Sequence, residues 1–338
     1  KMIMDNTNEM TLTPIGGQVM SQITLETQAE QAEHPNFIEA NTSGITLEEL
    51  SQHIVPTFGD GTLTLSSCGI INATMKAARE IFGDLTEPEI RVSHKINGRK
   101  PDAIHKATSE LTPEDTTTFY QRVACLARVK NLTRVINGSE VHLCVGATRS
   151  YAEDKLWGKV TPCKMRLFVG WFVKVCSNGC LTTDGCSGVI DVLSEADVYE
   201  KALALFGSYD PLKEETLSLL ENLANTRISE STFCQLVGRC RLYAALSSEE
   251  QSVLPKIVLG DQAMNKVVYG FKHNPNFALK EGENSISLWE LCQLCTEAVK
   301  SSYIDLWIER NQAAVDFCLG IQRALLGEDE EGYDWFIN

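Results

Sequence analysis

The distribution of apolar residues along the chain follows two different periods. Over residues 119–176, apolar and polar side chains alternate, or apolar and β-branched residues follow one another, which is typical of strands. From residue 194 onward, apolar residues recur every three or four positions, as they do on one face of a helix. This pattern predicts an α+β protein, in which an antiparallel β-meander sheet is packed by a helical C-terminal half.

The strand-rich part contains specific turn signals. Side chains alternate over residues 119–129, and residues 164–176 form a long apolar run in which Gly170 predicts a β-bulge. Between these two strands, Asn137 and Gly138 tolerate the positive φ angles of a two-residue hairpin turn. Tight turns between successive strands indicate a meander, because only antiparallel neighbours can be joined so closely.

Capping residues and helical periods define the remaining elements. Thr46 and Glu49 have the spacing of a capping box, and so have Ser287 and Glu290. A turn with a short strand is predicted over residues 58–67, followed by a helix that ends at Gly83. The predicted helices are at residues 71–83, 194–207, 210–225, 231–246, 287–301 and 304–327.

These elements divide the chain into four parts. We expect a disordered acidic arm over residues 1–44, a strand-rich domain over 45–190, a helical part packed on the sheet over 191–327, and an acidic-aromatic tail over 328–338. Three interpretations of the tail remain open. It is a solvated segment, a clamp docked on the protein itself, or a competitor of nucleic acid whose aromatic tip recruits a partner.

Composition narrows the class of protein. The chain has 338 residues, of which 43% are apolar and 22% charged, as in ordinary globular proteins. The 12 cysteines lack the regular spacing of a secreted disulfide framework. The start of the chain lacks the apolar core of a signal peptide, and no apolar run is long enough to span a bilayer. We therefore expect a cytoplasmic location, free buried thiols and no membrane partner.

Charge is distributed unevenly over an acidic chain. Residues 91–174, here called the basic segment, hold 15 of the 30 Lys and Arg but only 7 of the 45 Asp and Glu, against a net charge of −15 for the whole chain. One interpretation is a sheet whose cations are answered by acidic neighbours. The other is a surface built to meet a polyanion.

The densest polar cluster lies at residues 93–107. Asn97, Gly98 and Pro101 favour turns, which predicts a cationic loop beside the sheet. Such a loop can position phosphates, or it can simply be solvated. We expect the cations of this cluster to share one face with Arg91 and Arg149. The candidate nucleic-acid-binding residues are Arg91, His94, Lys95, Arg99, Lys100, His105, Lys106, Arg149, Lys174 and Asn178.

Common enzyme and metal motifs are absent from the sequence. No phosphate-binding loop, dinucleotide fingerprint, zinc-protease motif or nucleophile elbow occurs. Cys176, Cys180 and Cys186 lack the paired spacing of structural zinc sites, and Cys292 and Cys295 fall inside an apolar helical pattern. We expect no catalytic residue, metal or cofactor, although a hydrolase or nuclease without a recognisable motif remains a third possibility for function.

Several segments resemble a family of unknown function found in Bacteroidetes. They are IVPTFGDGTLTLSS (54–67), VSHKINGRKPDAIHKA (92–107), FYQRVACLARV (119–129), INGSEVHLCVGATRSY (136–151), LFVGWFVKVCSNGCLTTDG (167–185) and the closing SSYIDLWIERN and YDWFIN. The VCSNG element is also similar to a broader phage- and plasmid-type family of unknown function. The resemblance implies a mobile-element or prophage setting and brings no established activity.

The leading functional hypothesis is non-enzymatic binding of single-stranded nucleic acid through a basic sheet and loop surface. Single-strand binders combine a cationic groove with aromatic rings on which bases stack. The alternative hypothesis is an interaction module that binds a host or defence protein through its acidic helical face. The sequence leaves the oligomeric state open. The aromatic candidates for stacking are Phe119, Tyr120, Tyr151, Trp157, Phe168, Trp171 and Phe172.

Overall fold

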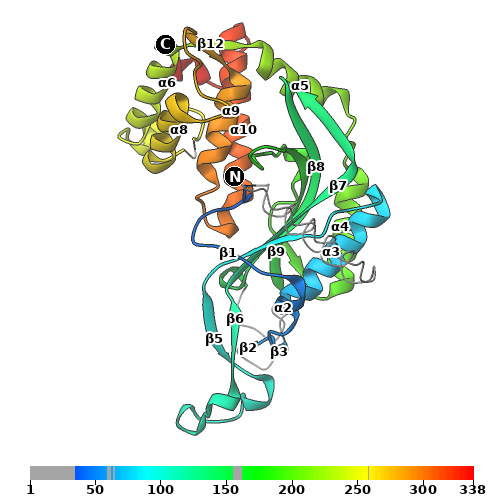
Figure 1. The fold of residues 1–338 in the computed structure, drawn as a ribbon. Coiled ribbons are helices and arrows are strands. Elements are labelled where there is room, and N and C mark those ends of the chain that lie inside the picture. The colour runs from blue at the N-terminus through cyan, green and yellow to red at the C-terminus, as the bar shows by residue number, and fades with distance from the viewer. Residues whose placement is uncertain (1–34, 59–61, 64, 155–161, 258) are drawn as a thin grey trace, which may run out of the picture. The chain divides into compact units, whose positions relative to one another are not determined.

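An antiparallel sheet forms the centre of the structure, which is a computed structural model (Figure 1). The model describes residues 35–58, 62–63, 65–154, 162–257 and 259–338. In spatial order, the strands are β1 (Ser43–Gly44), β4 (Glu89–Val92), β7 (Arg122–Ile136), β8 (Ser139–Ser150), β9 (Cys163–Val173) and β10 (Gly179–Cys180), and β11 (Ile190–Val192) also pairs with β9. The strands β7 to β10 follow one another in sequence and in space, which confirms the predicted meander.

Of two features predicted for the meander, a hairpin turn and a β-bulge, the structure contains the first and lacks the second. Asn137 and Gly138 have φ angles of 47° and 74°, as the predicted two-residue turn requires. The bulge predicted at Gly170 is absent, because Gly170 pairs with Cys144 in an unbroken register. Glycine is needed there for space instead, since a Cβ atom would lie 2.8 Å from the Cδ2 atom of Leu181.

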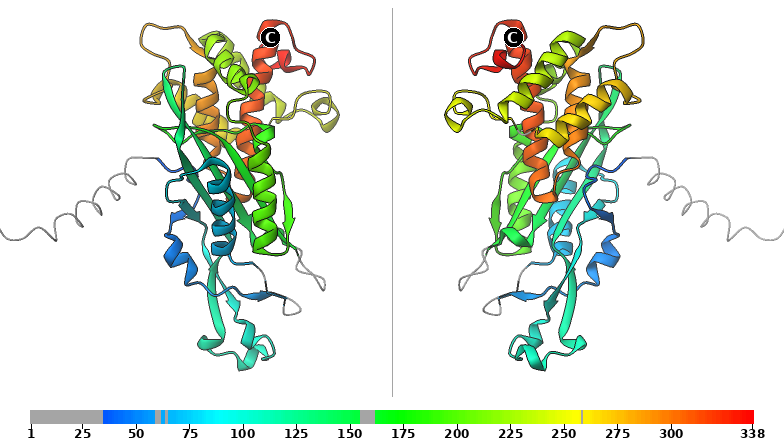
Figure 2. Two further views of the ribbon diagram at one scale, coloured as in Figure 1. Left: turned by 90° about the vertical axis from the view of Figure 1, so that its right-hand side faces the viewer. Right: turned by 90° about the vertical axis from the view of Figure 1, so that its left-hand side faces the viewer.

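Both faces of the central sheet are covered. On one face, alternate side chains of β7, β8 and β9 join a large core with α3 (Ser67–Phe82) and α4 (Glu195–Ser208), which lie side by side (Figure 2). On the other face, Phe168 and Phe172 contact Trp307 of α10 (Ile304–Leu326). Because neither face is open to water, β8 and β9 are buried almost without alternation.

The C-terminal half is helical, as predicted. The capping box between Ser287 and Glu290 is present. The sequence analysis missed two helices, at Ser248–Gln251 and Asp261–His273, and two short strands, at Arg227–Ser229 and Ser285–Ser287. Residues 36–338 form one compact unit, so a boundary near residue 190 stays a prediction. The further elements are α5 (Glu214–Asn225), β12 (Arg227–Ser229), α6 (Glu230–Tyr243), α7 (Ser248–Gln251), α8 (Asp261–His273), β13 (Ser285–Ser287) and α9 (Leu288–Val299).

No helix in the described part of the chain combines the length and the apolar character needed to cross a bilayer.

The expected disorder over residues 1–44 does not hold for the end of that range. Phe37 and Ile38 are fully buried against the second face of the sheet, and β1 extends the sheet at β4. Arg91 donates hydrogen bonds to the Oδ1 atom of Asn36 and to the carbonyl oxygen of Thr42, each at 3.1 Å. Buried apolar side chains therefore fix residues 36–44, whereas residues 1–34 lie outside the described part.

A two-stranded ribbon leaves the sheet between β4 and β7. It consists of β5 (Lys95–Arg99) and β6 (Thr116–Tyr120), and its far end holds the short 3₁₀ turns η1 (Pro101–Ala103), η2 (Thr108–Glu110) and η3 (Pro113–Asp115) (Figure 1). Five of the 15 residues in the loop predicted over residues 93–107 thus form a strand, in which Asn97 and Gly98 pair with Thr118 and Thr117. We call residues 94–120 the β-arm.

Three smaller elements surround the base of the β-arm. The helix α2 (Leu47–Ser51) begins with the predicted capping box of Thr46 and Glu49. The short strands β2 (Thr57–Phe58) and β3 (Thr62–Leu63) form a hairpin within the region where a turn and strand were predicted. The 3₁₀ turn η4 (Tyr151–Glu153) follows β8 and places Tyr151 beside Phe119 of the β-arm. A further turn, η5 (Thr183–Gly185), follows β10 away from the arm, where Gly185 lies against Val169.

The acidic-aromatic tail docks on the protein itself. Phe336 in the turn η6 (Tyr333–Phe336) is completely buried. Its ring packs against the ring of Phe317 of α10, with the two centroids 5.4 Å apart. The carboxylate of Asp329 accepts hydrogen bonds from the backbone of the turn. The guanidinium of Arg239 lies over the Trp335 ring at 4.9 Å. Of the three interpretations of the tail, these contacts support the structural clamp.

Removing the Phe336 ring should therefore destabilise the fold. We expect Phe336→Ala to lower the free energy of unfolding by about 3–5 kcal/mol, because a buried ring is lost and a cavity remains. Glu330→Gln, at an exposed position of the same tail, should change it by less than about 0.5 kcal/mol. Urea unfolding measures both, and equal values for the two variants would contradict the docked tail.

Candidate nucleic-acid interface

The structure brings six of the ten predicted site residues together on the β-arm. Lys95 and Arg99 lie on β5 and project to the same face, because alternate residues of a strand share a face. Lys100 begins the turn at the end of β5, and His94 precedes the strand. His94, Lys95, His105 and Lys106 are exposed, whereas Arg99 and Lys100 are half-buried.

The other four predicted residues lie elsewhere. Arg149 and Asn178 are buried, at 2% and 0% exposure, so the expectation that Arg149 shares an exposed face with the β-arm does not hold. Arg91 holds the segment before β1, as described above. Lys174 follows β9 at the opposite end of the sheet, where it pairs with Glu140 at 3.0 Å. The Nδ2 atom of Asn178 donates to the carbonyl oxygen of Gln293.

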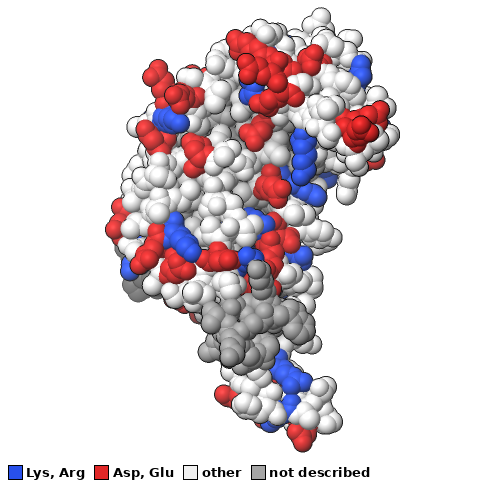
Figure 3. Space-filling view, turned by 180° about the vertical axis from the view of Figure 1, so that it is seen from behind, with Lys and Arg blue, Asp and Glu red and all other residues white. Residues whose placement is uncertain are grey.

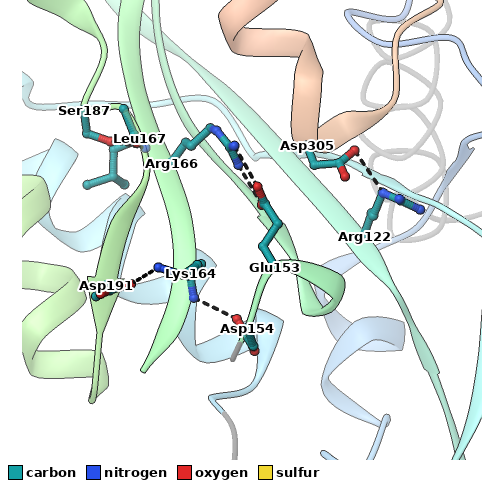
Figure 4. A network of polar contacts seen from close by, with 10 residues as sticks. Arg122, Glu153, Asp154, Lys164, Arg166, Leu167, Ser187, Asp191 and Asp305 are labelled. Atoms are coloured by element: carbon teal, nitrogen blue, oxygen red, sulfur yellow. Dashed lines mark hydrogen bonds and ion pairs between the residues drawn. The ribbon is translucent and has the colours of Figure 1, made fainter. Parts of the chain in front are cut away.

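Four of the eight Lys and Arg on the strands of the central sheet are paired with carboxylates, namely Arg122, Arg149, Lys164 and Arg166. Arg122 pairs with Asp305 at the start of α10 at 3.0 Å, and both terminal nitrogens of Arg166 reach Glu153 at 2.7 Å (Figure 4). Lys164 pairs with Asp191 on the neighbouring strand β11. For the sheet, this supports the interpretation that acidic neighbours answer the cations of the basic segment.

The β-arm also carries equal numbers of acidic and basic residues, and its ion pair joins two residues of the arm itself. The β-arm carries four Lys or Arg and four Asp or Glu. Lys106 pairs with Asp115 at 2.7 Å, and Arg99 donates to the carbonyl oxygen of Lys106 and to Thr108. Among the described residues, no carboxylate lies within ion-pair distance of Lys95. Lys95 is therefore the exposed cation of the arm that remains available to a ligand.

Most of the candidate aromatic residues are unavailable for stacking. Phe168, Trp171 and Phe172 belong to the two cores, and Trp157 lies outside the described part of the chain. Tyr120 is half-buried at the base of the β-arm, beside Lys95, whose Nζ atom lies 5.5 Å from the ring centroid. The aromatic surface expected along the sheet is thus reduced to the base of the arm.

A pocket of about 250 Å³ opens at the base of the β-arm. Its aromatic wall contains Tyr120 and His53, whose rings meet edge to face at 5.0 Å, and the pair of Phe119 and Tyr151, also edge to face at 5.0 Å. His53 is fixed by a 2.9 Å hydrogen bond between its Nδ1 atom and the carbonyl oxygen of Thr118. Side chains distant in sequence therefore form one concave surface.

A second part of the pocket wall is the first turn of α3. Ser66 caps this helix, because its hydroxyl oxygen accepts a hydrogen bond from the backbone N–H of Gly69 at 2.9 Å. Cys68, Asn72 and Glu195 also line this wall. Glu195 is the first residue of α4, and its carboxylate lies directly against Gly69. This placement suits a carboxylate, since the N-terminus of a helix favours negative charge.

A buried ion pair fixes this wall from behind. Arg149 pairs with Asp154 at 2.9 Å, and both side chains are at most 4% exposed. The same guanidinium donates to the carbonyl oxygen of Leu65 at 2.8 Å and lies 4.0 Å from the centroid of the Tyr151 ring. Leu65 directly precedes the cap of α3. Arg149 therefore positions the pocket and does not itself offer a charge to a ligand on the surface.

The sequence of the chain matches one known protein family over most of its length. Residues 19–337 match the family described as "Domain of unknown function, B. Theta Gene description (DUF3871)". The chain belongs to this family. The description confirms the expected family of unknown function and assigns no activity. No match to the chain was found among the curated proteins or among the solved structures.

The pocket of this DUF3871 member favours binding over nucleophilic chemistry. Burial raises the pKa of the Cys68 thiol, and the Glu195 carboxylate raises it further, so the thiol stays protonated at neutral pH. Among the described residues, no group of three or more His, Cys, Asp or Glu side chains has a geometry that could hold a metal ion. The pocket therefore offers hydrogen bonds and aromatic contacts to a ligand.

Of the residues that line this DUF3871 pocket, sequence analysis named only Phe119, Tyr120 and Tyr151 as candidates, and it missed the polar ones that matter most for binding. His53, Ser66, Asn72 and Glu195 come from different parts of the chain and form no motif. The only available signal was local, since the serine before the apolar helix over residues 71–83 has the identity of a helix cap.

The ion pair at the end of the β-arm gives a prediction for titration. The hydrogen bond from Lys106 and those from Thr112 lower the pKa of Asp115 to about 2. Because the folded pKa lies below the unfolded one, the contact is intact above about pH 4 and is lost as the pH falls toward 2. We expect Lys106→Gln to move the pKa of Asp115 upward in an NMR titration of its side chain. An unchanged pKa would contradict the pairing.

The buried ion pair gives a prediction for stability. Arg149→Met should lower the free energy of unfolding by about 3–5 kcal/mol, because it leaves the Asp154 carboxylate buried without its cation. Lys174→Met, which breaks the exposed pair with Glu140 at the other end of the sheet, should cost at most about 1 kcal/mol. Urea unfolding of both variants tests the difference, and a similar loss in both would refute the positioning role of Arg149.

Proposed function

We propose that this DUF3871 protein binds single-stranded nucleic acid, without catalysis, through the β-arm and the pocket at its base. The observation that carries the proposal is the pairing of Lys95 with the Tyr120 ring at the edge of that pocket. A cation beside an aromatic ring matches the repeating unit of a single strand, because a phosphate meets the ammonium group while the neighbouring base stacks.

The direction of the β-arm supports this proposal. The ribbon stands away from the central sheet, so a flexible strand can follow it without meeting the helical end (Figure 1). On the strand pairs of the arm, Lys95 faces Tyr120, Asn97 faces Thr118, and Arg99 faces Thr116. Directly opposed residues share one face of a ribbon. One face therefore carries two cations, an amide, hydroxyl groups and one ring, all of which can contact a nucleic-acid backbone.

The charges of the rest of the molecule limit where a polyanion can bind. Figure 3 shows acidic side chains gathered over the helical end, whereas basic and acidic side chains lie next to each other on the projecting β-arm. A chain with a net charge of −15 repels nucleic acid at long range. We infer weak binding that depends on a few phosphate contacts and on stacking at the base of the arm.

The cellular setting belongs to the same proposal. The described cysteines are free, which suits the reducing cytoplasm. The mobile-element or prophage setting implied by the resemblance would supply single strands during replication or transfer.

Neutralising cations of the β-arm should weaken binding. We expect Lys95→Gln/Lys100→Gln to lower the affinity for a short fluorescent oligothymidine, measured by anisotropy at low salt. The slope of log K against log salt should become shallower by about 1.4, if each lysine contacts one phosphate of a single strand. The loss should be similar for strands of different sequence, because phosphate contacts carry no sequence information.

A double variant elsewhere on the sheet provides the matched control. Lys130→Gln/Lys174→Gln removes the same charge from the strands beyond the β-arm and should leave the affinity and the salt slope nearly unchanged. Equal effects of the two double variants would show that net charge alone governs binding and would refute the assignment to the β-arm. Absence of binding by the unaltered protein at low salt would refute the function.

The acidic helical end supports a second candidate function. Exposed apolar side chains occur in the same half of the chain, including Val253 at 77% and Tyr269 at 69% exposure. Exposed apolar side chains of this size favour contact with another protein. Binding of a host or defence protein at this end would respond weakly to salt, which distinguishes it from nucleic-acid binding.

A further inference from the structure

The pocket at the base of the β-arm has a negative end as well as an aromatic wall. The carboxylate of Glu195 borders it, and no hydrogen-bond donor or cation among the described residues is within bonding distance of that carboxylate. Asn72, an exposed residue of α3 on the same wall, adds an amide. A ligand in the pocket therefore meets rings on one side and a hydrogen-bond acceptor with full charge on the other.

Glu195 is held in this position by the shape of α3. A Cβ atom on residue 69 would lie 1.9 Å from the Oε1 atom of Glu195, so the carboxylate fits there only because residue 69 is glycine. Ser66 already occupies the backbone N–H of Gly69. The carboxylate thus lies against the first turn of α3, where the helix favours its charge, while its oxygens retain the capacity to accept further hydrogen bonds.

We propose that this pocket binds one unstacked guanine base of the bound strand. The inference rests on the proposed function, since the strand must first lie along the β-arm. Of the four DNA bases, guanine alone presents two adjacent N–H donors, N1–H and the N2 amino group, on its pairing edge, and a carboxylate accepts both at once. Thymine offers one such donor on that edge, and adenine and cytosine offer one amino group beside an acceptor.

The other contacts of the pocket agree with a nucleotide as the ligand. The base would stack on Tyr120 and His53 of the lining, while its phosphate meets Lys95 beside the Tyr120 ring. The ammonium group of Lys95 also disfavours a cationic ligand, which would otherwise suit a carboxylate with aromatic neighbours. The Glu195 carboxylate in the lining and the Lys95 ammonium group beside Tyr120 together match a base with donors and an anionic phosphate.

The affinity ratio between two probes tests the inference. The first probe is a short oligothymidine, and the second is the same strand with one central guanine. We expect the guanine strand to bind about tenfold tighter, as a good bidentate contact provides. Replacing that guanine by inosine, which lacks the N2 amino group, should remove most of the preference, and adenine should give none.

Two variants assign the preference to the pocket. Glu195→Gln should bring the ratio of the two affinities close to one, because the charged bidentate acceptor is lost. Gly69→Ala should do the same by displacing the carboxylate, so the test does not depend on one substitution. Glu200→Gln, at an exposed position of α4 that does not line the pocket, should leave the ratio unchanged. Thermal unfolding verifies that each variant is folded.

The outcomes separate this inference from the proposed function. If both strands bind equally well to the unaltered protein, the guanine pocket is refuted while strand binding stands. If the preference survives in both Glu195→Gln and Gly69→Ala, the base is recognised elsewhere and the inference is likewise refuted. If neither strand binds at low salt, the proposed function fails, and the inference fails with it.

Discussion

The ring of Trp307 in α10 packs against the rings of Phe37 and Phe168, with centroid distances of 5.4 Å in both pairs. These contacts close the second face of the central sheet. An antiparallel sheet can leave one face in water, but here the strands β8 and β9 are buried on both sides. Covering the second face requires both the start of α10 and the segment around Phe37, which are far apart in sequence. The ion pair of Arg122 with Asp305 fixes the helix at the rim of the same face.

Closing both faces removes the sheet as a binding surface. On its strands, Arg122, Lys164 and Arg166 pair with carboxylates of α10, β11 and η4. With both faces covered, a ligand meets the sheet at its ends. The β-arm leaves the sheet at one of these ends, and the first turns of α3 and α4 lie beside its base. The pocket results from this convergence, and the buried pair of Arg149 and Asp154 stabilises it from within.

Local signals in the sequence predicted the parts of the fold that local chemistry decides. The turn at Asn137 and the capping boxes at Thr46 and Ser287 depend on residues a few positions apart, and all three are present. The helix α8 was missed because its apolar stripe is narrow within a polar sequence. The site was predicted less well. Nothing near Arg149 in the sequence shows that Asp154 and Leu65 enclose its guanidinium, since that burial depends on contacts across 84 residues.

The balance of charge on the β-arm has a consequence for recognition. Many nucleic-acid-binding proteins gain affinity from an extended positive field, which attracts every sequence alike. This protein has an acidic body and an arm with equal numbers of acids and bases, so such a field is missing. The proposed binding at the arm would then come from short-range contacts, of which stacking and hydrogen bonds to a base are the ones that depend on sequence. A weak electrostatic term thus makes a selective pocket more important for binding than it would be on a strongly basic surface.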